Sequence, residues 1–520
     1  MKKQKMSREK IAKLEIGHTE ISRCQQLVLS LFFLALIALY PVAQILYETR
    51  GKPLCEIQEL QLGQRLSTAS RGEWGAALKS YETSLEESSL LRAVLLEPAQ
   101  KFLTGVFASG NEKVIVGSDG WLFYASDFNY LANPGFLRPE RLYKRKLKGG
   151  QPDPVSAVLD FQRQLKARGI RLILLPVPAK PMLYGDKLGG NAAVGSVLQN
   201  PSFDKFRRAM EANGITVLDL ASEFALLRLA GTEPYLKTDT HWTPEAMEIA
   251  AAELAERVSG KKVQPYSATR QMTHLGDIAA MLKLQMPEKF FPAETVTIRP
   301  CENFRVVPDA PVLLLGDSFS NIYSVPAMQW GEKSGLAERL SAYLGCNIDV
   351  IARNDAGAFA TREFLSNELR RGRDRLAGKK VVIYEFAIRE LADGNWKMLD
   401  LTLGKAPEVR FLALDAPRRV TATVERVSMV PRPNFAPYKD HIMSVHFVDI
   451  DGGNEQALIY IKSMVDNVWT PAAQWRPGDQ VTVTLMPWSG DVESQFGSWN
   501  RSDLDDEELL LQEPLWGELK

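Results

Sequence analysis

The sequence predicts an α/β domain built on a mostly parallel sheet with flanking helices, preceded by a transmembrane helix and followed by a small all-β domain. Three observations lead to this prediction. Continuously apolar segments alternate with amphipathic ones between residues 111 and 403, an uncharged apolar run lies near the N-terminus, and helical patterns end after residue 403. Strands that are apolar throughout are typical of parallel sheets covered by helices on both faces.

The first 47 residues predict a signal anchor. Residues 1–26 form a basic leader with seven Lys and Arg against three Glu, and residues 27–47 follow with an uncharged stretch over Leu27–Ala43. Its length is close to the roughly 20 residues that cross a bilayer. The basic flank favours a cytoplasmic N-terminus and a single pass that exports everything behind it. A cleaved signal peptide is the alternative, although "YPVAQILYE" is a poor cleavage site.

Between the anchor and the sheet, residues 48–110 are expected to be helical or linker sequence with few strand signals. The domain of residues 111–403 then begins with "EKVIVGSDGWLFYASD", a β-like run with a glycine turn. The alternation follows as the helix "DPVSAVLDFQRQLKARG", the strand "IRLILLPVP", a helix over residues 202–213 and the strand "GITVLDL". Gly169 ends the first of these helices as a plausible C-cap.

The second half of the domain repeats the pattern. The helix "WTPEAMEIAAAELAERVSG" begins with Thr243 as a natural N-cap and Pro244 in the first helical position, where a missing N–H costs nothing. Next come the strand "APVLLLGDS", a helix near residues 335–344, the strand "NIDVIA", a helix after Thr361 and the strand "KKVVIYEFA". Together these segments predict a sheet of several parallel strands with helical crossovers.

Residues 404–490 predict a separate β domain, either an OB-like barrel or a carbohydrate-binding sandwich. Residues 491–520 are expected to form an acidic C-terminal tail that packs one short hydrophobic segment.

Charge and cysteine content exclude some functions. Lys plus Arg and Asp plus Glu number 63 each, so no overall field would recruit nucleic acid. The four cysteines lack metal-ligand spacing, so we expect neither a metal nor another cofactor. Cys301 and Cys346 flank one α/β unit in the exported part and are the more plausible disulfide pair.

A candidate nucleophile follows a predicted strand. In "LLLGDSFSN", Ser318 lies in the turn directly after a buried strand, and ligands of open parallel sheets bind at the carboxyl ends of strands. A serine hydroxyl attacks only when a neighbouring base removes its proton. The alternative reading is an ordinary capping serine.

Among five histidines, His241 is the best candidate base. Asp239 precedes it by two residues, so in an extended segment both side chains project from the same face. A carboxylate at that place can orient the imidazole through Nδ1 and leave Nε2 for Ser318. The alternative is a hydrogen-bonded turn, since Asp-x-His often caps a helix.

Five blocks in this order resemble the SGNH-hydrolase-like family of alginate O-acetyltransferases, periplasmic proteins that acetylate exopolysaccharides. They are "GSDGWLFY", "LLPVPAKPMLY", "DTHWTPEAMEIAA", "VLLLGDSFS" and "VVIYEFAIREL", spread over about residues 112–395. The resemblance implies a flavodoxin-like SGNH sheet and a triad of Asp239, His241 and Ser318. It also implies a periplasmic protein with a multipass membrane O-acyltransferase as the acetyl supplier. With the predicted signal anchor, this places the catalytic domain in the periplasm and the anchor in the cell inner membrane.

The sequence departs from ordinary SGNH hydrolases at two places. Their Asp-x-x-His follows the serine, whereas here one residue separates the pair and the pair comes first. For their oxyanion asparagine the nearest counterpart is Asn354 in "ARNDAGA", which would act with the Ser318 backbone N–H. A turn asparagine is the alternative.

Three residues inside the shared blocks or near them are candidates for substrate binding, because aromatic rings stack on sugars and basic groups pair with uronate carboxylates. They are Lys180, Tyr323 and Arg389. Core packing or surface solvation is the alternative for each.

The preferred hypothesis is therefore a membrane-anchored O-acetyltransferase that moves an acetyl group through Ser318 to hydroxyls of an exported exopolysaccharide. A carbohydrate acetylesterase with the same triad is the first alternative, with water in place of the sugar. A non-catalytic glycan-binding scaffold of a polysaccharide secretion complex is the second.

Overall fold

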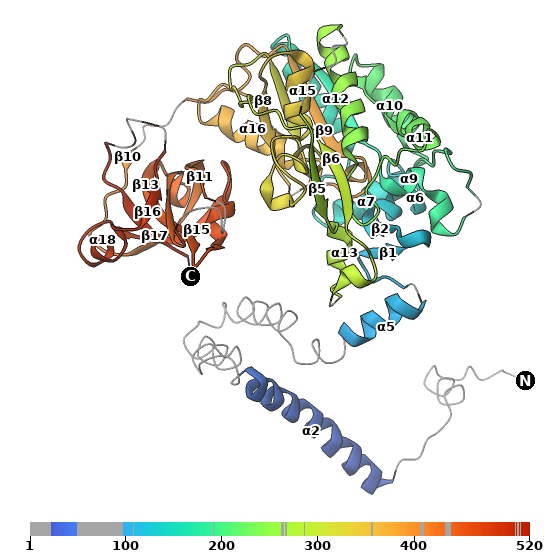
Figure 1. The fold of residues 1–520 in the computed structure, drawn as a ribbon, viewed down its shortest axis with the longest axis horizontal. Coiled ribbons are helices and arrows are strands. Elements are labelled where there is room, and N and C mark those ends of the chain that lie inside the picture. The colour runs from blue at the N-terminus through green and yellow to red at the C-terminus, as the bar shows by residue number, and fades with distance from the viewer. Residues whose placement is uncertain are drawn as a thin grey trace, which may run out of the picture. The chain divides into compact units, whose positions relative to one another are not determined.

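The computed structural model describes residues 22–48, 97–107, 109–190, 192–261, 265, 268–284, 286–354, 357–405, 410–431, 438–504, 506, 509 and 511–519. The chain forms two compact units, one of residues 1–111 with 282–290 and one of residues 112–281 with 291–520. Figure 1 traces both units.

The first unit contains the predicted anchor segment. Helix α2 (Arg23–Glu48) covers the apolar run, and helix α5 (Glu97–Phe107) follows. The apolar side chains of α2 are 55–63% exposed at positions such as Leu29, Phe32 and Phe33. Within the described residues, no helix combines the length and hydropathy needed to span a membrane. Residues 1–21 of the leader and 49–96 of the 48–110 region lie outside the described residues.

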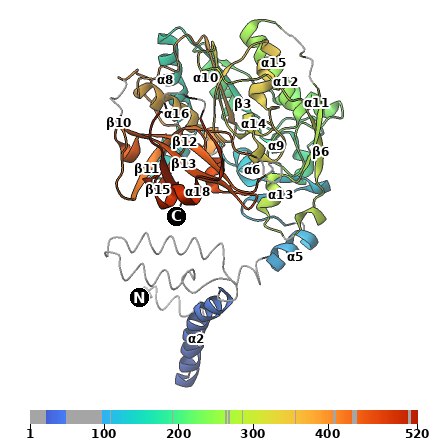
Figure 2. The same ribbon diagram turned by 60° about the vertical axis from the view of Figure 1, so that its left-hand side comes forward.

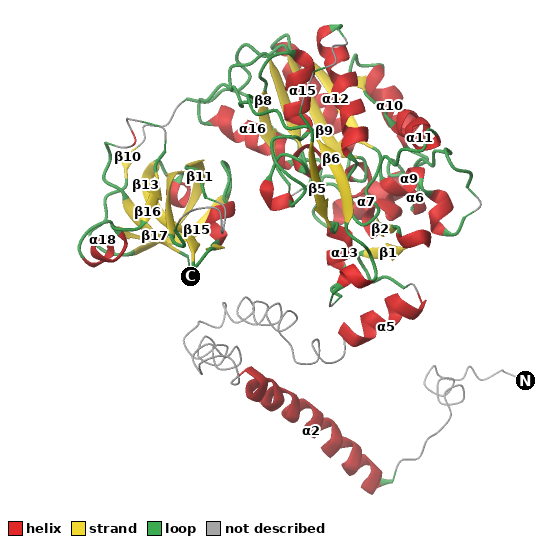
Figure 3. Ribbon diagram, viewed as in Figure 1, coloured by secondary structure: helices red, strands yellow, loops and turns green. Residues whose placement is uncertain are grey.

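The second unit is built on a parallel sheet. Its five strands lie in the order β4-β3-β9-β7-β8 and every pair is parallel. The strands are β3 (Arg171–Val177), β4 (Thr216–Val217), β7 (Val312–Gly316), β8 (Asp349–Ala352) and β9 (Val381–Ala387). In Figure 3, strands β8 and β9 of this sheet lie among helices. The predicted α/β class is therefore confirmed.

Two hydrophobic clusters explain why the strands are apolar throughout. Alternate residues of one strand enter different clusters: in β7, Leu314 joins the first and Leu313 the second. Helices α11 (Ala221–Leu229), α12 (Pro244–Ser259) and α15 (Leu336–Leu344) supply the first cluster. Helices α8 (Pro154–Ala167), α10 (Phe203–Glu211) and α16 (Ala360–Arg370) supply the second. Both faces of the sheet are thus covered.

Shorter elements surround the sheet. The 112–127 run forms an antiparallel hairpin of β1 (Val114–Val116) and β2 (Leu122–Tyr124). The helices are α6 (Ala125–Ala132), α7 (Pro139–Leu147), α9 (Lys180–Leu183), α13 (Asp277–Met281), α14 (Ser318–Asn321) and α17 (Glu390–Asp393). Strands β5 (Arg270–His274) and β6 (Glu294–Ile298) pair antiparallel to each other.

The C-terminal part is all-β, as expected, and its main strands close into a barrel. Five strands form the ring β13-β17-β15-β11-β12, because β12 also pairs with β13. They are β11 (Arg418–Val427), β12 (His441–Val448), β13 (Glu455–Val465), β15 (Gln480–Pro487) and β17 (Leu515–Glu518). Minor elements are β10 (Arg410–Phe411), β14 (Val468–Trp469), β16 (Asn500–Ser502) and α18 (Asp491–Phe496). Figure 2 shows several of these strands together.

The predicted boundary of this domain at residue 490 is wrong. Residues 491–520 were expected to be an acidic tail, but they contain α18, β16 and the barrel strand β17. Leu515 and Trp516 are buried at 5% and 0% exposure. Their burial supplies the free energy that holds this acidic segment in the fold.

Candidate active site

Ser318 lies where the prediction placed it, at the carboxyl end of a buried central strand. Strand β7 ends at Gly316, Asp317 is the N-cap, and Ser318 is the first residue of α14. Asp317 holds the turn by accepting hydrogen bonds from the backbone N–H groups of Phe319 and Ala387, both at 2.8 Å. Only glycine fits at 316, because a Cβ there would lie 2.3 Å from Ser320 Oγ.

The structure brings Asp239, His241 and Ser318 into one chain of hydrogen bonds. His241 Nδ1 lies 2.6 Å from Asp239 Oδ1, and His241 Nε2 lies 2.8 Å from Ser318 Oγ. Asp239 and His241 are 2% and 3% exposed, whereas Ser318 is half-buried. Of these three residues, Ser318 is thus the one that a substrate can reach. With Nδ1–H donating to the carboxylate, Nε2 is free to take the proton of Ser318.

Four N–H groups saturate the Asp239 carboxylate. Oδ1 also accepts from the His241 backbone N–H at 3.0 Å, and Oδ2 accepts from Trp330 Nε1 at 2.8 Å and the Asp277 N–H at 3.0 Å. Burial by itself would raise the pKa of Asp239. The hydrogen bond and charge of His241, and the hydrogen bonds from the Trp330 ring and the Asp277 backbone, outweigh burial and hold the pKa of Asp239 well below its usual range. Asp239 therefore stays ionised.

The same surroundings make His241 a stronger base. Burial lowers its pKa, but the hydrogen bond and charge of Asp239 and the charges of Asp277 and Asp317 outweigh this and raise it above 6.5. A histidine with a raised pKa accepts a proton more readily.

Two carboxylates from a later part of the chain fix the segment that carries Asp239. Thr240 donates its backbone N–H to Asp277 at 2.7 Å, and Lys237 and Thr238 donate theirs to Glu294 at 2.8 and 3.0 Å. No local pattern pointed to Asp277, Glu294 or Trp330, because the β5–α13–β6 excursion and the loop before α15 bring them in from positions distant in sequence.

Asn354 follows β8 and contacts the helix of the nucleophile. Its Oδ1 accepts from Asn321 Nδ2 at 2.6 Å, and its Nδ2 points to Met328 Sδ at 3.3 Å. Asn321 belongs to α14, three residues after Ser318. The structure thus places Asn354 beside the nucleophile turn, and its role as an oxyanion donor stays a prediction.

The residues predicted to bind substrate take other roles. Lys180 is 1% exposed and donates to the carbonyl oxygens of Leu122 at 2.7 Å and Lys237 at 3.2 Å. Burial lowers the pKa of Lys180 to about 8. Tyr323 is fully buried and donates to the Trp242 carbonyl at 2.7 Å. Both side chains are buried and make their hydrogen bonds to backbone carbonyls within the fold, so their role in substrate binding stays a prediction.

Arg389 is also engaged inside the fold. Its Nη1 lies 2.9 Å from Asp127 Oδ1, and its guanidinium lies 5.3 Å from the centre of the Tyr124 ring. The arginine side chain is 17% exposed. It ties β9 to α6, which is a structural role.

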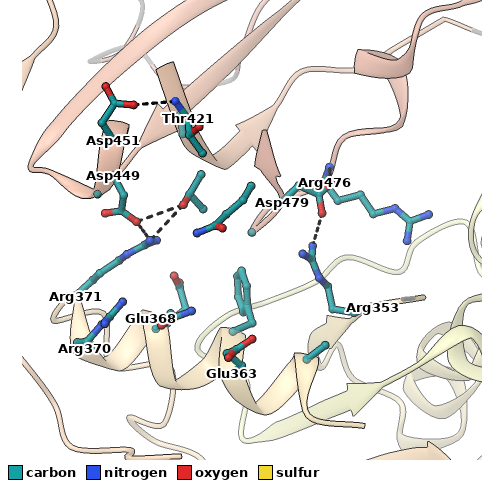
Figure 4. A pocket seen from close by; sticks show the side chains of 18 of the residues that line it. Arg353, Glu363, Glu368, Arg370, Arg371, Thr421, Asp449, Asp451, Arg476 and Asp479 are labelled. Carbon is teal, nitrogen blue, oxygen red and sulfur yellow. Dashed lines mark hydrogen bonds and ion pairs between the residues drawn. The ribbon is translucent and has the colours of Figure 1, made fainter. Parts of the chain in front are cut away.

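A cavity of about 1240 Å³ opens beside Asn354. Met328, Arg353 and Asn354 line it from the α/β domain, and the barrel contributes a wall with several charged side chains. Figure 4 shows Arg353 and Arg371 reaching toward Asp479 and Asp449 of the barrel. Both arginines form ion pairs with these aspartates, and that of Arg353 measures 2.9 Å.

Cys301 and Cys346, the more plausible disulfide pair, are not bonded to each other. Among the described residues, one group offers three ligand-type atoms within 4.8 Å of one another: Asp239, His241 and Asp277. N–H and O–H donors already occupy these carboxylates, so the arrangement suits proton transfer better than metal binding.

Comparison with known proteins identifies the family of this chain. Residues 114–388 match the family model described as SGNH hydrolase-like domain, acetyltransferase AlgX. The chain is 29% identical over 225 residues to a probable alginate O-acetylase AlgJ of Pseudomonas fluorescens, covering 42% of this chain and 52% of that protein. It is also 29% identical over 186 residues to a probable alginate O-acetylase AlgJ of Pseudomonas aeruginosa, covering 34% of this chain and 43% of that protein. The chain thus spans about half, or less, of the length of these relatives.

Two solved structures are similar to this chain. The O-acetyltransferase domain of Pseudomonas putida AlgJ is 23% identical with a TM-score of 0.40, covering 54% of this chain and 93% of that one. Pseudomonas aeruginosa AlgX is 14% identical with a TM-score of 0.35, covering 71% and 90%. The family match spans more than half of the 520 residues and confirms the resemblance drawn from the five blocks. The chain belongs to the SGNH hydrolase-like family of the acetyltransferase AlgX.

Proposed function

We propose that this protein is a polysaccharide O-acetyltransferase that carries the acetyl group on Ser318. The observation that supports this most is the hydrogen-bonded chain from Asp239 through His241 to the half-buried Ser318 hydroxyl. Family membership and the names of the AlgJ relatives, probable alginate O-acetylases, support the acetyl group and a polysaccharide acceptor.

In the first half-reaction, Ser318 Oγ attacks the carbonyl carbon of an acetyl donor while its proton passes to His241 Nε2. The tetrahedral intermediate collapses, the bond to the leaving group breaks, and His241 returns the proton to the leaving group. Acetyl-Ser318 remains. Asp239 holds the imidazole and stabilises the imidazolium in both steps.

In the second half-reaction, a sugar hydroxyl takes the place of the leaving group. His241 removes its proton as the sugar oxygen attacks the acetyl carbon, and then protonates Ser318 Oγ as the acyl bond breaks. The backbone N–H of Ser318 and the amide of Asn354 are the proposed donors to the oxyanion in each half-reaction. Such a donor typically contributes about 10²–10³-fold in rate.

An acetylesterase would use the same three residues, with water as the acceptor. The two activities differ in the fate of acetyl-Ser318. We would incubate the purified protein with a chromogenic acetyl ester, with and without an oligosaccharide. Acetyl found on the sugar supports the transferase, and release of acetate alone contradicts it.

Substitution of Ser318 by Ala tests the catalytic role itself. The variant should lose ester cleavage and transfer, while Ser320→Ala should lose far less, because the Ser320 hydroxyl donates to Glu385 at 2.6 Å and not to His241. If Ser318→Ala keeps polymer acetylation, the protein acts without this nucleophile, as a non-catalytic scaffold would.

We further propose that residues 27–47 anchor the protein in the inner membrane with the catalytic domain in the periplasm, where a multipass O-acyltransferase supplies acetyl groups. The basic leader and the uncharged run that follows it support this placement. Alkaline phosphatase fused behind residue 111 should be active in intact cells. An inactive fusion would contradict the proposal.

A further inference from the structure

Asp277 forms hydrogen bonds to two residues of the segment that carries Asp239 and His241, the proposed acid–base pair. Its backbone N–H donates to Asp239 Oδ2 at 3.0 Å, and its carboxylate accepts from Thr240, the residue between Asp239 and His241. Both the N–H and the hydroxyl of Thr240 donate to it, at 2.7 Å and at 3.0–3.1 Å. The neighbouring Gly276 packs so closely that a Cβ would lie 2.3 Å from the Thr238 carbonyl. The start of α13 therefore fits the segment without room for displacement.

The carboxylate of Asp277 is also close enough to act through its charge. One side-chain atom each of Asp239, His241 and Asp277 lie within 4.8 Å of one another. Opposite charges within about 4–6 Å favour each other's ionised forms, and like charges oppose them. Asp277 therefore supports a positive charge on His241 and disfavours a second negative charge beside Asp239.

Other charged groups face this cluster. Lys180, on α9, is buried, and Asp239, Glu294 and Asp277 each raise its pKa against the lowering by burial. Burial and the charge of Asp239 raise the pKa of Asp277 to about 6, against the opposing charge of His241 and the Thr240 hydrogen bonds. His274 lies on β5, where burial lowers its pKa. The charge of Asp277 thus changes within the range in which a histidine base titrates.

We propose that Asp277 is a positioning residue of the acetyl-transfer site: its carboxylate holds the Asp239–His241 segment in place, and its negative charge makes His241 a stronger base. This inference rests on the proposed function, because it assigns Asp277 to the same reaction. It adds a second carboxylate that a pattern of Asp, His and Ser alone does not contain.

The direction of the effect follows from the charges. When Asp277 is ionised it stabilises imidazolium at His241, so removing the charge should lower the pKa of His241. Asp277→Asn keeps an oxygen for the Thr240 N–H and removes the charge, while its NH₂ group can donate to the Thr240 hydroxyl. A shift of about one pH unit is expected for a charge at this distance.

Titration of His241 by NMR tests the inference without requiring activity. The full chain, labelled with [¹³C]histidine and carrying Ser318→Ala, gives five histidine signals, of which His241 is the one lost in His241→Gln. Asp277→Asn should lower the His241 midpoint by about one pH unit, and Asp277→Glu should keep it. Glu294→Gln is the matched control, because it alters a carboxylate bound to the same segment yet should leave the midpoint unchanged.

Kinetics supply the second readout. For a chromogenic acetyl ester, the acidic limb of kcat/KM against pH should move to lower pH in Asp277→Asn, with a loss of only a few-fold on the plateau. A purely structural role would lower the plateau without moving the limb and would overturn the inference. So would an unchanged NMR midpoint, or equal shifts in Asp277→Asn and Glu294→Gln. If the wild type shows no acetyl chemistry, the proposed function fails, while the NMR titration still decides the role of Asp277.

Discussion

Replacing Asp239 by asparagine should remove most of the activity while leaving the protein folded. All four groups that contact the Asp239 carboxylate are donors: the His241 ring and backbone, Trp330 and Asp277. An asparagine side chain has one oxygen, which accepts, and one NH₂ group, which donates. The NH₂ group must therefore lie against N–H groups that are themselves donors. The consequence depends on which way the amide turns.

The two orientations of the amide leave different numbers of buried N–H donors without an acceptor. With NH₂ toward His241, only the His241 backbone N–H loses its acceptor, because the ring can change tautomer and accept at Nδ1. With NH₂ toward Trp330 and Asp277, two buried donors lose theirs. Each buried donor without an acceptor costs about 1–3 kcal/mol. Because the first orientation leaves one fewer such donor, it is preferred by about 5- to 150-fold. In that tautomer Nε2 carries hydrogen and cannot accept the proton of Ser318.

The loss of charge adds to the tautomer effect. Without the carboxylate, the imidazolium formed in each half-reaction has no negative partner at Nδ1. The two effects together should bring the loss in kcat toward the about 10⁴-fold known for this substitution in serine-protease triads. The kcat for a chromogenic acetyl ester, measured beside a thermal unfolding curve, checks this value.

A second buried aspartate provides the control. Asp349 is fully buried at the start of β8, at the opposite end of that strand from Asn354, and pairs with Lys379 at 3.2 Å and with Arg375. Asp349→Asn should lower stability by about 3–5 kcal/mol and change kcat little. If Asp239→Asn keeps kcat within ten-fold of the wild type, or loses no more than Asp349→Asn, the reasoning about the tautomer is wrong.

Three further predictions concern the surroundings of the nucleophile. Glu385 accepts from the Asp317 N–H at 2.9 Å, and burial and the charge of Asp317 raise its pKa well above its usual range, which favours the neutral carboxyl. Glu385→Gln should therefore keep kcat within a few-fold and Glu385→Ala should lose ten-fold or more, and equal losses would contradict this. Arg353→Ala should lower kcat severalfold with KM unchanged, because its ion pair with Asp479 steadies the residue before the proposed oxyanion donor; a double-mutant cycle with Asp479→Ala should show non-additive losses. Finally, kcat/KM should fall as the pH falls through the raised pKa of His241, above 6.5, because only the neutral imidazole accepts a proton; a flat profile between pH 6 and 8 would refute this.

Local patterns were sufficient to predict the α/β fold and the position of Ser318 after a buried strand. Parallel strands are apolar on both faces, so segments such as Val312–Gly316 are recognisable without knowledge of their neighbours. A polar turn directly after such a strand must lie at the rim of the sheet, and an Asp two residues before a His shares its face. These regularities follow from the geometry of the backbone over a few residues.

Burial and long-range contacts were not predictable in the same way. Lys180 and Tyr323 are polar residues of the shared blocks, and nothing in the sequence indicates that backbone carbonyls satisfy their donors inside the core. Asp277 and Trp330 lie 38 and 91 residues after Asp239. Their contacts depend on how the β5–α13–β6 excursion folds back, which a local pattern does not encode.

The predicted end of the β domain at residue 490 was wrong for a related reason. The acidic composition between residues 491 and 520 suggested a tail outside the β domain with one short packed hydrophobic segment, but Leu515 and Trp516 lie in strand β17 of the barrel. A strand that closes a barrel is defined by its partners β13 and β15, which lie earlier in the chain.

The most direct test of the account is mass spectrometry of the protein after brief incubation with an acetyl ester. The account predicts an acetyl group on the peptide that contains Ser318, absent from Ser318→Ala and His241→Gln, and removed when an oligosaccharide is added as the acetyl appears on the sugar. An unmodified Ser318 in a protein that still acetylates the sugar, or sugar acetylation by Ser318→Ala, would contradict it.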